Sequence, residues 1–179
     1  AARVRDNFIS EKQLASPEIM FSVRFLRPNL THSMDLYYGA WAVLDPTRNM
    51  VDAFECTDGK PWGESPLTVR PDESILYGND DALKKAERAK MFMNRDRRLY
   101  ESVNHSMMAN FVDDGFKDEE VQVNESNNKG PTGFSALKYV QPTDVTPGYS
   151  TVSDADIVVL RYAHVLLMIA EAENEAHGA

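Results

Sequence analysis

The sequence predicts a mainly α-helical protein with short β-strands and a long loop-rich region. Apolar residues recur at steps of three and four over residues 160–177, which is the spacing of one helix face. The preceding part of the chain alternates short apolar runs with turn-forming Pro, Gly, Asn and Asp. The 179 residues fit one domain, with a loop-rich, mixed region over about 1–156 and the start of a helix-pair region over about 157–179.

The first predicted element is a buried strand over residues 19–25. Its apolar residues, which alternate in part with polar ones, are Ile19, Met20, Phe21, Val23 and Phe25. Pro28 then predicts a turn, because the proline ring fixes φ at a value that suits turns. A loop that contains Tyr37, Tyr38 and Trp41 follows.

A short helix is predicted to follow Thr47, and either Asp45 or Thr47 can cap its N-terminus. The residues of its apolar face are Met50, Val51 and Phe54. Gly59 ends this segment and suits a turn that needs a positive φ. A second helix is predicted over residues 82–91, which are rich in the strong helix formers Ala, Lys, Glu and Leu.

The last part of the chain has two strand-like runs, at residues 120–123 and 134–140, and then a long helix over residues 160–177. The apolar face of this helix consists of Tyr162, Val165, Leu166, Ile169, Ala172 and Ala176. Gly178 lies where a glycine commonly ends a helix. Since most helical stability comes from packing, this face requires a second helix, and we expect the chain to be part of a longer protein.

The charge and the cysteine content restrict the possible partners. The net charge is -9 and the pI is about 4.9, so phosphate backbones would be repelled and no nucleic-acid partner is predicted. Cys56 is the only cysteine, which excludes a disulfide within the chain and a cysteine-based zinc site. The longest apolar stretch, residues 157–170, is interrupted by Arg161 and His164 and is too short to span a bilayer.

The sequence contains no recognisable catalytic or cofactor motif. Phosphate-binding loops, dinucleotide-binding glycine motifs and the nucleophile elbow are all absent. The histidines, which show no metal-ligand spacing, are His32, His105, His164 and His177. We interpret His164 as a structural histidine, because its neighbours in the predicted helix are apolar. No catalytic residue, metal or cofactor is therefore predicted.

Two charged segments favour structural interpretations. The acidic residues of the first are Asp113, Asp114, Asp118, Glu119 and Glu120. They do not match a calcium-binding loop, because Val112 occupies a position that must supply oxygen, and a solvated charged loop is favoured. In the second segment, Asp96 between Arg95 and Arg98 predicts ion pairing that holds a loop in place.

Aromatic residues in loops are the candidate ligand-binding residues: Tyr37, Tyr38, Trp41 and Trp62. Aromatic rings stack against the apolar faces of sugars, and their polar groups can bind sugar hydroxyls. The alternative is that these large side chains are simply core residues. Two carboxylates of a glycoside hydrolase also remain possible, because their separation is a spatial property that the sequence does not give.

Five segments, in order, resemble the SusD/RagB family of nutrient-binding proteins. They are residues 18–24 (EIMFSVR), 46–55 (PTRNMVDAFE, followed by Asp58-Gly59), 94–100 (NRDRRLY), 138–139 (KY) and 160–176 (LRYAHVLLMIAEAENEA). The chain departs from the family pattern at Arg97, where proline is usual, and at His164 and Ile169, where glutamate and tyrosine are usual. It also has Glu173 where leucine is usual, which indicates a more exposed helix edge.

The resemblance implies a partial copy of a fold that combines a tetratricopeptide-type α-superhelix with a loop-rich region. It implies a non-catalytic lipoprotein of the outer-membrane surface, anchored through an N-terminal cysteine that this chain lacks. It implies a SusC-like TonB-dependent transporter as partner and a glycan ligand, or a peptide ligand in the RagB branch, without a cofactor. A glycoside hydrolase and a helix-pair scaffold for protein partners are the remaining alternatives. Family ligand sites lie in variable loops, so no site residue is transferred by the resemblance.

Overall fold

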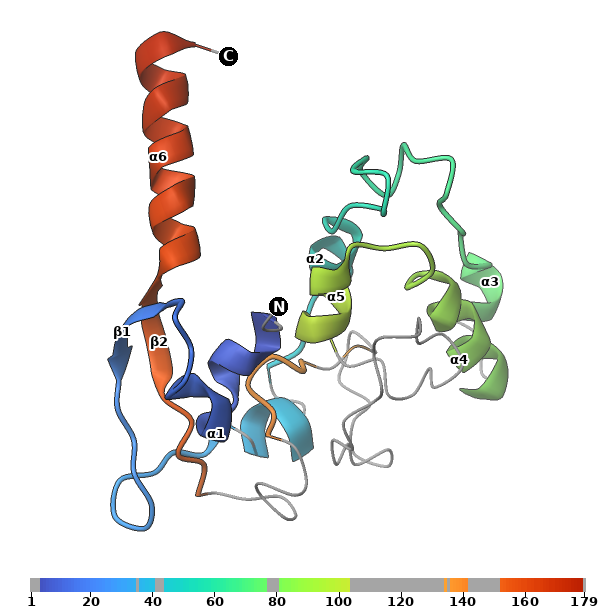
Figure 1. Ribbon diagram of the computed structural model, residues 1–179. Coiled ribbons are helices and arrows are strands. Elements are labelled where there is room, and N and C mark those ends of the chain that lie inside the picture. The colour runs from blue at the N-terminus through green and yellow to red at the C-terminus, as the bar shows by residue number, and fades with distance from the viewer. Residues whose placement is uncertain are drawn as a thin grey trace.

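The structure is a computed structural model that describes residues 4–34, 36–40, 44–76, 81–103, 134, 136–141 and 152–178. The helical elements are η1 (Val4–Phe8), α1 (Ser10–Gln13), the π-helical turn η2 (Leu36–Ala40), α2 (Arg48–Asp52), α3 (Glu73–Leu76), α4 (Asp81–Lys90), α5 (Arg97–Ser102) and α6 (Tyr162–His177). The strands are β1 (Ile19–Val23) and β2 (Ile157–Arg161). This composition confirms the predicted fold class, mainly α with short strands, and Figure 1 shows the arrangement.

The two strands form an antiparallel pair that joins segments far apart in the sequence. Ile19 pairs with Arg161 and Val23 with Ile157, and the register is irregular near Phe21. The strand predicted over residues 19–25 is confirmed over most of its length. The second strand was missed, because the apolar run at 157–161 continues into the helical pattern that follows it. Arg161, the last residue of β2, has an extended backbone (φ -122°, ψ 157°), and α6 begins at the next residue.

Helix α6 continues from β2 and projects away from the rest of the molecule, as Figure 1 shows. At its start the backbone N–H of Arg161 donates to Nδ1 of His164 at 3.1 Å, which satisfies one group at the helix N-terminus. This bond gives His164 the structural role predicted for it. Gly178 ends the helix with a φ of 76°, as its position in the sequence predicted. None of the residues of α6 is buried.

The hydrophobic core lies between α2, α3, α4 and α5. Its buried residues are Val51, Leu76, Ala89, Met91, Phe92, Leu99, Val103 and Phe134. The ring of Phe92 lies 6.4 Å from that of Tyr100 and 6.3 Å from that of Phe134, so aromatic contacts join α5 to the chain around it. The core therefore unites four short helices, none of which would be stable in isolation.

The predicted helices near residues 47 and 82 are confirmed as α2 and α4. Thr47 caps α2 by accepting a hydrogen bond from the backbone N–H of Met50 at 3.2 Å, and Gly59 has a φ of 76°. The helix ends at Asp52, so Phe54 packs against the core from beyond it.

Two other predictions for local structure were wrong. The segment after Asp96 was expected to be a loop and is helix α5, because the Asp96 carboxylate accepts from the backbone N–H of Arg98 at 2.7 Å and caps the helix. The described part of residues 134–140 was expected to be a strand, but it forms one bridge, between Val103 and Ala136, followed by a turn. Residues 120–123 lie outside the described ranges.

The guanidinium group of Arg95 is buried, with 1% of the residue exposed. It donates three hydrogen bonds to backbone carbonyls, to Met91 at 2.7 Å, to Val51 at 2.6 Å and to Phe54 at 2.7 Å. Of the two arginines expected to pair with Asp96, Arg98 does so, with its Nε 2.9 Å from Oδ1 of Asp96. Arg95 instead connects the end of α4 to α2 and to the segment after α2.

We expect Arg95→Ala to lower the free energy of unfolding by about 3 kcal/mol or more, because several buried carbonyls would lose their donors together. Urea unfolding followed by circular dichroism measures this effect. Arg97→Ala is the matched control, since the Arg97 side chain is 62% exposed and its Nε lies 3.8 Å from Oε1 of Glu101. The control should cost less than about 1 kcal/mol. Equal losses in the two variants would contradict the role assigned to Arg95.

The cap at Asp96 predicts a dependence of stability on pH. The Arg98 side chain and the Arg98 backbone N–H hold the pKa of Asp96 below its ordinary value. The carboxylate therefore adds stability above its ordinary pKa, and this contribution disappears as the pH falls through the lowered pKa. We expect Asp96→Ala to cost about 1 kcal/mol at pH 7. The difference from the unmodified chain should shrink toward pH 3, and a constant difference between pH 7 and pH 3 would exclude this explanation.

Candidate ligand-binding site

A pair of tyrosines forms the candidate site. Tyr38 lies on the π-helical turn η2, and Tyr139 lies on a turn within the described segment 136–141. Their rings are stacked, with centroids 6.3 Å apart and planes inclined by 22°. Both residues are half-buried, so each keeps part of its surface exposed. Tyr37, the neighbour of Tyr38 on η2, is 43% exposed.

The ring of Tyr139 is held in place by buried neighbours. Phe8, which is 3% exposed, meets it edge-on with centroids 4.9 Å apart and planes at 65°. The backbone N–H of Val158 donates to the Tyr139 hydroxyl at 3.3 Å. On the Phe8 ring lie two cations, Nζ of Lys138 at 4.3 Å and Cζ of Arg161 at 5.5 Å from the centroid. Segments from both ends of the chain thus fix the orientation of Tyr139.

The electrostatics of this cluster keep Tyr139 neutral. Burial raises the pKa of the Tyr139 hydroxyl above its ordinary value, although the hydrogen bond from Val158 acts in the opposite direction. Burial, and then the charge of Arg161, lowers the pKa of Lys138. A neutral phenol can both donate and accept a hydrogen bond. The stacked pair therefore combines an apolar ring surface with a polar group, as a site that binds the face of a sugar ring requires.

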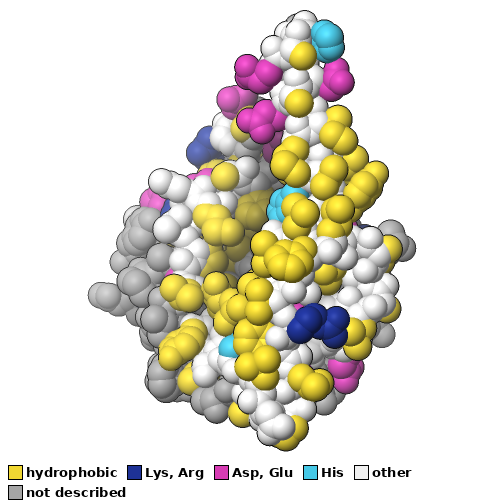
Figure 2. Space-filling model, turned by 90° about the vertical axis from the view of Figure 1, so that its left-hand side faces the viewer, with side chains coloured by type: hydrophobic (Ala, Val, Ile, Leu, Met, Phe, Trp, Pro, Cys, Tyr) yellow, Lys and Arg dark blue, Asp and Glu magenta, His cyan; other side chains and the backbone are white. Residues whose placement is uncertain are grey.

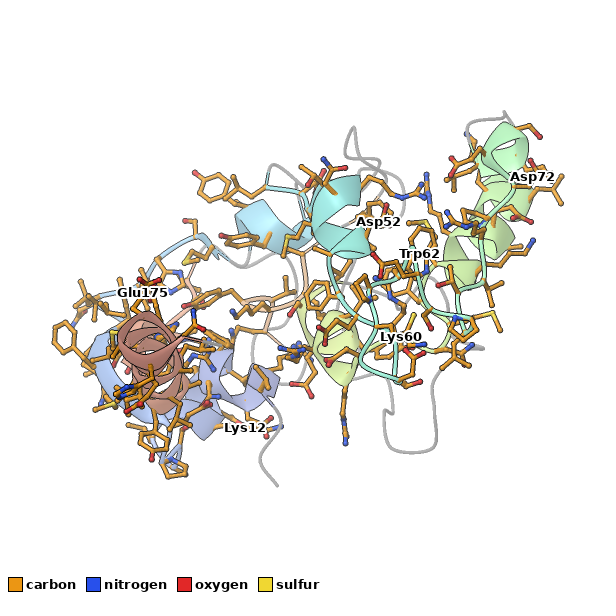
Figure 3. All side chains as sticks on the ribbon, turned by 90° about the horizontal axis from the view of Figure 1, so that it is seen from above. Lys12, Asp52, Lys60, Trp62, Asp72 and Glu175 are labelled. Atoms are coloured by element: carbon orange, nitrogen blue, oxygen red, sulfur yellow. The ribbon has the colours of Figure 1, made fainter. Side chains whose placement is uncertain are left out.

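Trp62 lies in a different environment, on the side of the molecule away from α6. Figure 3 shows it among side chains near Asp52 and Lys60, far from Glu175 on α6. The residue is only 5% exposed. Three guanidinium groups lie over its ring, with the Cζ atoms of Arg48, Arg70 and Arg95 at 5.6, 5.4 and 5.3 Å from the centroid.

This cover makes Trp62 a packed residue in the structure. Its indole nitrogen is buried and has no hydrogen-bond partner among the described residues, because guanidinium groups are donors and cannot accept from it. A ligand could reach the ring only if the arginines moved. The position of Trp62 is therefore that of a core residue, which was the alternative to ligand binding in the sequence analysis. Ligand binding by Trp62 stays a prediction.

The structure brings together one part of the predicted site. Tyr37 and Tyr38 are adjacent on η2, which replaces the loop expected there. No ring contact joins Trp62 to either tyrosine among the described residues. Trp41 lies outside the described ranges, as do His105 and the acidic residues at 113–120.

Tyr139 is the residue that reasoning from the sequence missed. It was assigned to a predicted strand, and its contact with Tyr38 spans most of the loop-rich region. A local pattern gives no signal for such a contact. The same is true of Lys138, whose position over Phe8 depends on two segments from opposite ends of the chain.

The described residues include no group of three or more His, Cys, Asp or Glu side chains placed to hold a metal ion. Within the same residues, no helix has the length and the apolar content that crossing a bilayer requires.

Comparison with known proteins identifies the family. The model of the SusD family matches residues 18–179, which is most of the chain. The chain belongs to the SusD family. Its fold is similar to the crystal structure of a SusD-like protein from Bacteroides fragilis, with a TM-score of 0.53 and 20% sequence identity. That match covers 98% of this chain and 35% of the SusD-like chain, so this chain spans about a third of the length of the protein it resembles. No curated protein matches the chain.

Membership of the SusD family confirms the resemblance found in the sequence. The likeness to the Bacteroides fragilis protein concerns the fold, because the sequence identity is low.

We expect Trp62 to behave as a structural residue. Trp62→Ala should lower the free energy of unfolding by about 3 kcal/mol, the usual loss when a buried aromatic side chain is removed. The chain has two tryptophans, so the fluorescence of a Trp41→Phe variant reports on Trp62 alone. Its emission should be blue-shifted and poorly quenched by acrylamide. Strong quenching would show instead that the ring is accessible to a ligand.

Proposed function

We propose that the chain is the part of a surface nutrient-binding protein that captures glycans without cleaving them. The stacked pair Tyr38–Tyr139 in a chain of the SusD family is the observation that carries this proposal. A sugar would lie against the exposed parts of these rings, with Tyr37 beside them, and its hydroxyl groups would bind the phenol groups. The parent protein would act at the outer membrane, anchored by lipid, and would deliver the glycan to a SusC-like TonB-dependent transporter.

The chemistry of the described residues supports capture of a neutral ligand. The chain carries a net charge of -9, which disfavours anionic polymers, and a neutral oligosaccharide meets no such repulsion. The half-buried tyrosines offer ring surface that is already oriented, so a ligand does not have to order them on binding. A peptide ligand of the RagB type remains the alternative, since aromatic rings and phenol groups also bind peptides.

A binding titration against a panel of soluble glycans and peptides tests the proposal. Saturable binding of one glycan class, with the ligand recovered intact, is the expected result. Binding of peptides alone would favour the RagB-type function. Release of shorter products from a labelled oligosaccharide would contradict capture and indicate a glycoside hydrolase that uses two carboxylates.

Substitution of the tyrosines locates the site. We expect Tyr38→Ala to weaken glycan binding by about 1–3 kcal/mol, the scale for truncation of an aromatic residue at the centre of an interface. Tyr37→Ala should have a smaller effect, because its ring is outside the stacked pair. Trp41→Ala should also weaken binding if this predicted residue belongs to the same site. Isothermal titration calorimetry measures each change.

Tyr162→Ala is the matched control for these variants. Tyr162 is 53% exposed and lies on α6, away from η2. This substitution should leave the affinity unchanged. Full affinity in Tyr37→Ala, Tyr38→Ala and Trp41→Ala together would exclude the proposed site.

A further inference from the structure

His32 joins two segments that are far apart in the sequence. It lies between β1 and η2, and its backbone pairs with Ser153, which lies shortly before β2. The backbone N–H of His32 donates to the Ser153 carbonyl at 2.9 Å, and the N–H of Ser153 donates back at 3.0 Å. The His32 ring packs edge-on against that of Phe25, with centroids 4.6 Å apart and planes at 87°. Backbone pairing and ring packing together hold the imidazole in one place.

Both ring nitrogens of His32 are bonded to backbone groups. Nε2 lies 2.7 Å from the carbonyl oxygen of Ala155, and because a carbonyl can only accept, Nε2 carries a proton. Nδ1 accepts a hydrogen bond from the backbone N–H of Met34 at 3.2 Å. An N–H group can only donate, so Nδ1 presents its lone pair to Met34. The two bonds together require the neutral ring with its proton on Nε2.

The bond between Met34 and His32 lies directly before the turn that carries the candidate site. η2 begins two residues after Met34, and the carbonyl of Ser33 accepts from the backbone N–H of Tyr37 at 3.1 Å. The bond has the pattern of an Asx-turn, in which a side chain accepts from the backbone N–H two residues further along and so fixes the direction of the chain. The position of η2, and with it that of Tyr38, therefore depends on a lone pair of His32.

We propose that His32 is a positioning residue of the candidate ligand-binding site, and that the site forms only while the His32 ring is neutral. Protonation places a hydrogen on Nδ1, so two N–H groups would face each other where Nδ1 now accepts from Met34. That contact must break, which releases the start of η2 and moves Tyr38 away from Tyr139. Histidine ordinarily changes its charge between pH 5 and pH 8. The site would therefore hold its ligand at neutral pH and release it in acid, a consequence that rests on the proposed function.

The charged groups on the described segments packed against His32 pair with one another. They are Arg24, Arg27, Asp154 and Asp156. Nε of Arg24 lies 2.8 Å from the Asp156 carboxylate, and a guanidinium nitrogen of Arg27 lies 3.2 Å from that of Asp154. Asp35, the residue after Met34, lies outside the described ranges. On the side of the molecule formed by β1, β2 and α6, hydrophobic side chains predominate (Figure 2). Carboxyl groups ordinarily stay ionised at pH 5.5, so a change at η2 between pH 7.5 and pH 5.5 reports on a histidine.

Nuclear magnetic resonance of the isotope-labelled chain tests the proposal without a ligand. The His32 ring should carry its proton on Nε2 at pH 7.5 and should be protonated at pH 5.5. Over this range the protection of the Met34 and Tyr37 amides against hydrogen exchange, corrected for the intrinsic effect of pH, should fall about fivefold, as expected when one hydrogen bond is lost. The contact between the ring protons of Tyr38 and Tyr139 should weaken in parallel. A ring with its proton on Nδ1, a ring that stays neutral at pH 5.5, or unchanged protection while the ring titrates would overturn the proposal.

Two substitutions separate the bond to Met34 from the packing of the ring. His32→Asn keeps an acceptor for the Met34 N–H but does not titrate, so the protection of η2 should stay high at both pH values. His32→Phe keeps a ring against Phe25 but has no acceptor, so the protection should be low at both. The matched control is His164→Asn, because Nδ1 of His164 accepts a backbone N–H in the same way, from Arg161 at 3.1 Å, at the start of α6. The control should keep the full pH effect at η2, and an equal pH effect in His32→Asn would overturn the proposal.

Ligand titration at the two pH values separates this proposal from the proposed function. With the glycan that binds in the panel titration, the affinity of the unmodified chain should fall about fivefold between pH 7.5 and pH 5.5, in line with the loss of one hydrogen bond. The affinity of His32→Asn should not change. Equal affinity of the unmodified chain at the two pH values would overturn the role of His32 and leave glycan capture standing. If no glycan binds at either pH while the magnetic resonance changes occur, glycan capture is contradicted and the placement of Tyr38 by His32 stands.

Discussion

The buried guanidinium of Arg95 is the interaction on which the helical part of the structure depends. Removing a cation from water is costly, and here the three carbonyl oxygens of Val51, Phe54 and Met91 offset that cost. These carbonyls belong to the end of α4, to α2 and to the segment after α2. A lysine could not replace this arginine, because its single ammonium group cannot direct bonds to carbonyls spread over a planar fork. The relative position of α2 and α4 follows from this geometry.

The part of the chain around the candidate site uses the same principle. Arg5 is 1% exposed, and it donates to the carbonyl of Val140 at 2.7 Å while its backbone N–H donates to the carboxylate of Glu101 at 2.8 Å. Gln13 donates to the carbonyl of Asp156 at 2.7 Å, and the backbone N–H of Asp156 donates back to the Gln13 amide oxygen. Loops have no regular hydrogen-bond ladder of their own, so buried polar side chains satisfy their backbone groups.

These polar contacts are the reason why Tyr139 lies where it does. The carbonyl of Val140 is bound by Arg5, and the carbonyls of Tyr139 and Phe8 both accept from the side-chain amide of Gln141. The turn is thereby held against η1, so the ring of Tyr139 packs edge-on against Phe8 and also stacks with Tyr38. The tyrosine pair is thus a consequence of how the loops are joined, and η2 contributes one half of it.

Secondary-structure elements could be predicted from the sequence where their formation depends on interactions between residues close together in the chain. β1, α2, α4 and α6 were found because each combines a periodic pattern with a local start or stop signal, such as Thr47 or Gly178. α5 was missed because Asp96 was interpreted as an ion-pair partner, although it is also a helix cap. β2 was missed because its apolar run merges with the pattern of α6, and only pairing with β1 separates the two.

The candidate site could be predicted only in part, for the same reason. The aromatic residues were identified from their chemistry, but burial is decided by distant partners. Arg48, Arg70 and Arg95 converge on Trp62 from three segments and cover it. Tyr38, by contrast, is half-buried, and among the described residues its ring contacts that of Tyr139. The apolar face of α6 is the opposite case, because its pattern is fully local and yet none of its residues is buried. An apolar pattern in the sequence therefore identifies a surface that requires packing against another segment. Only the three-dimensional structure shows whether the described part of the chain covers that surface.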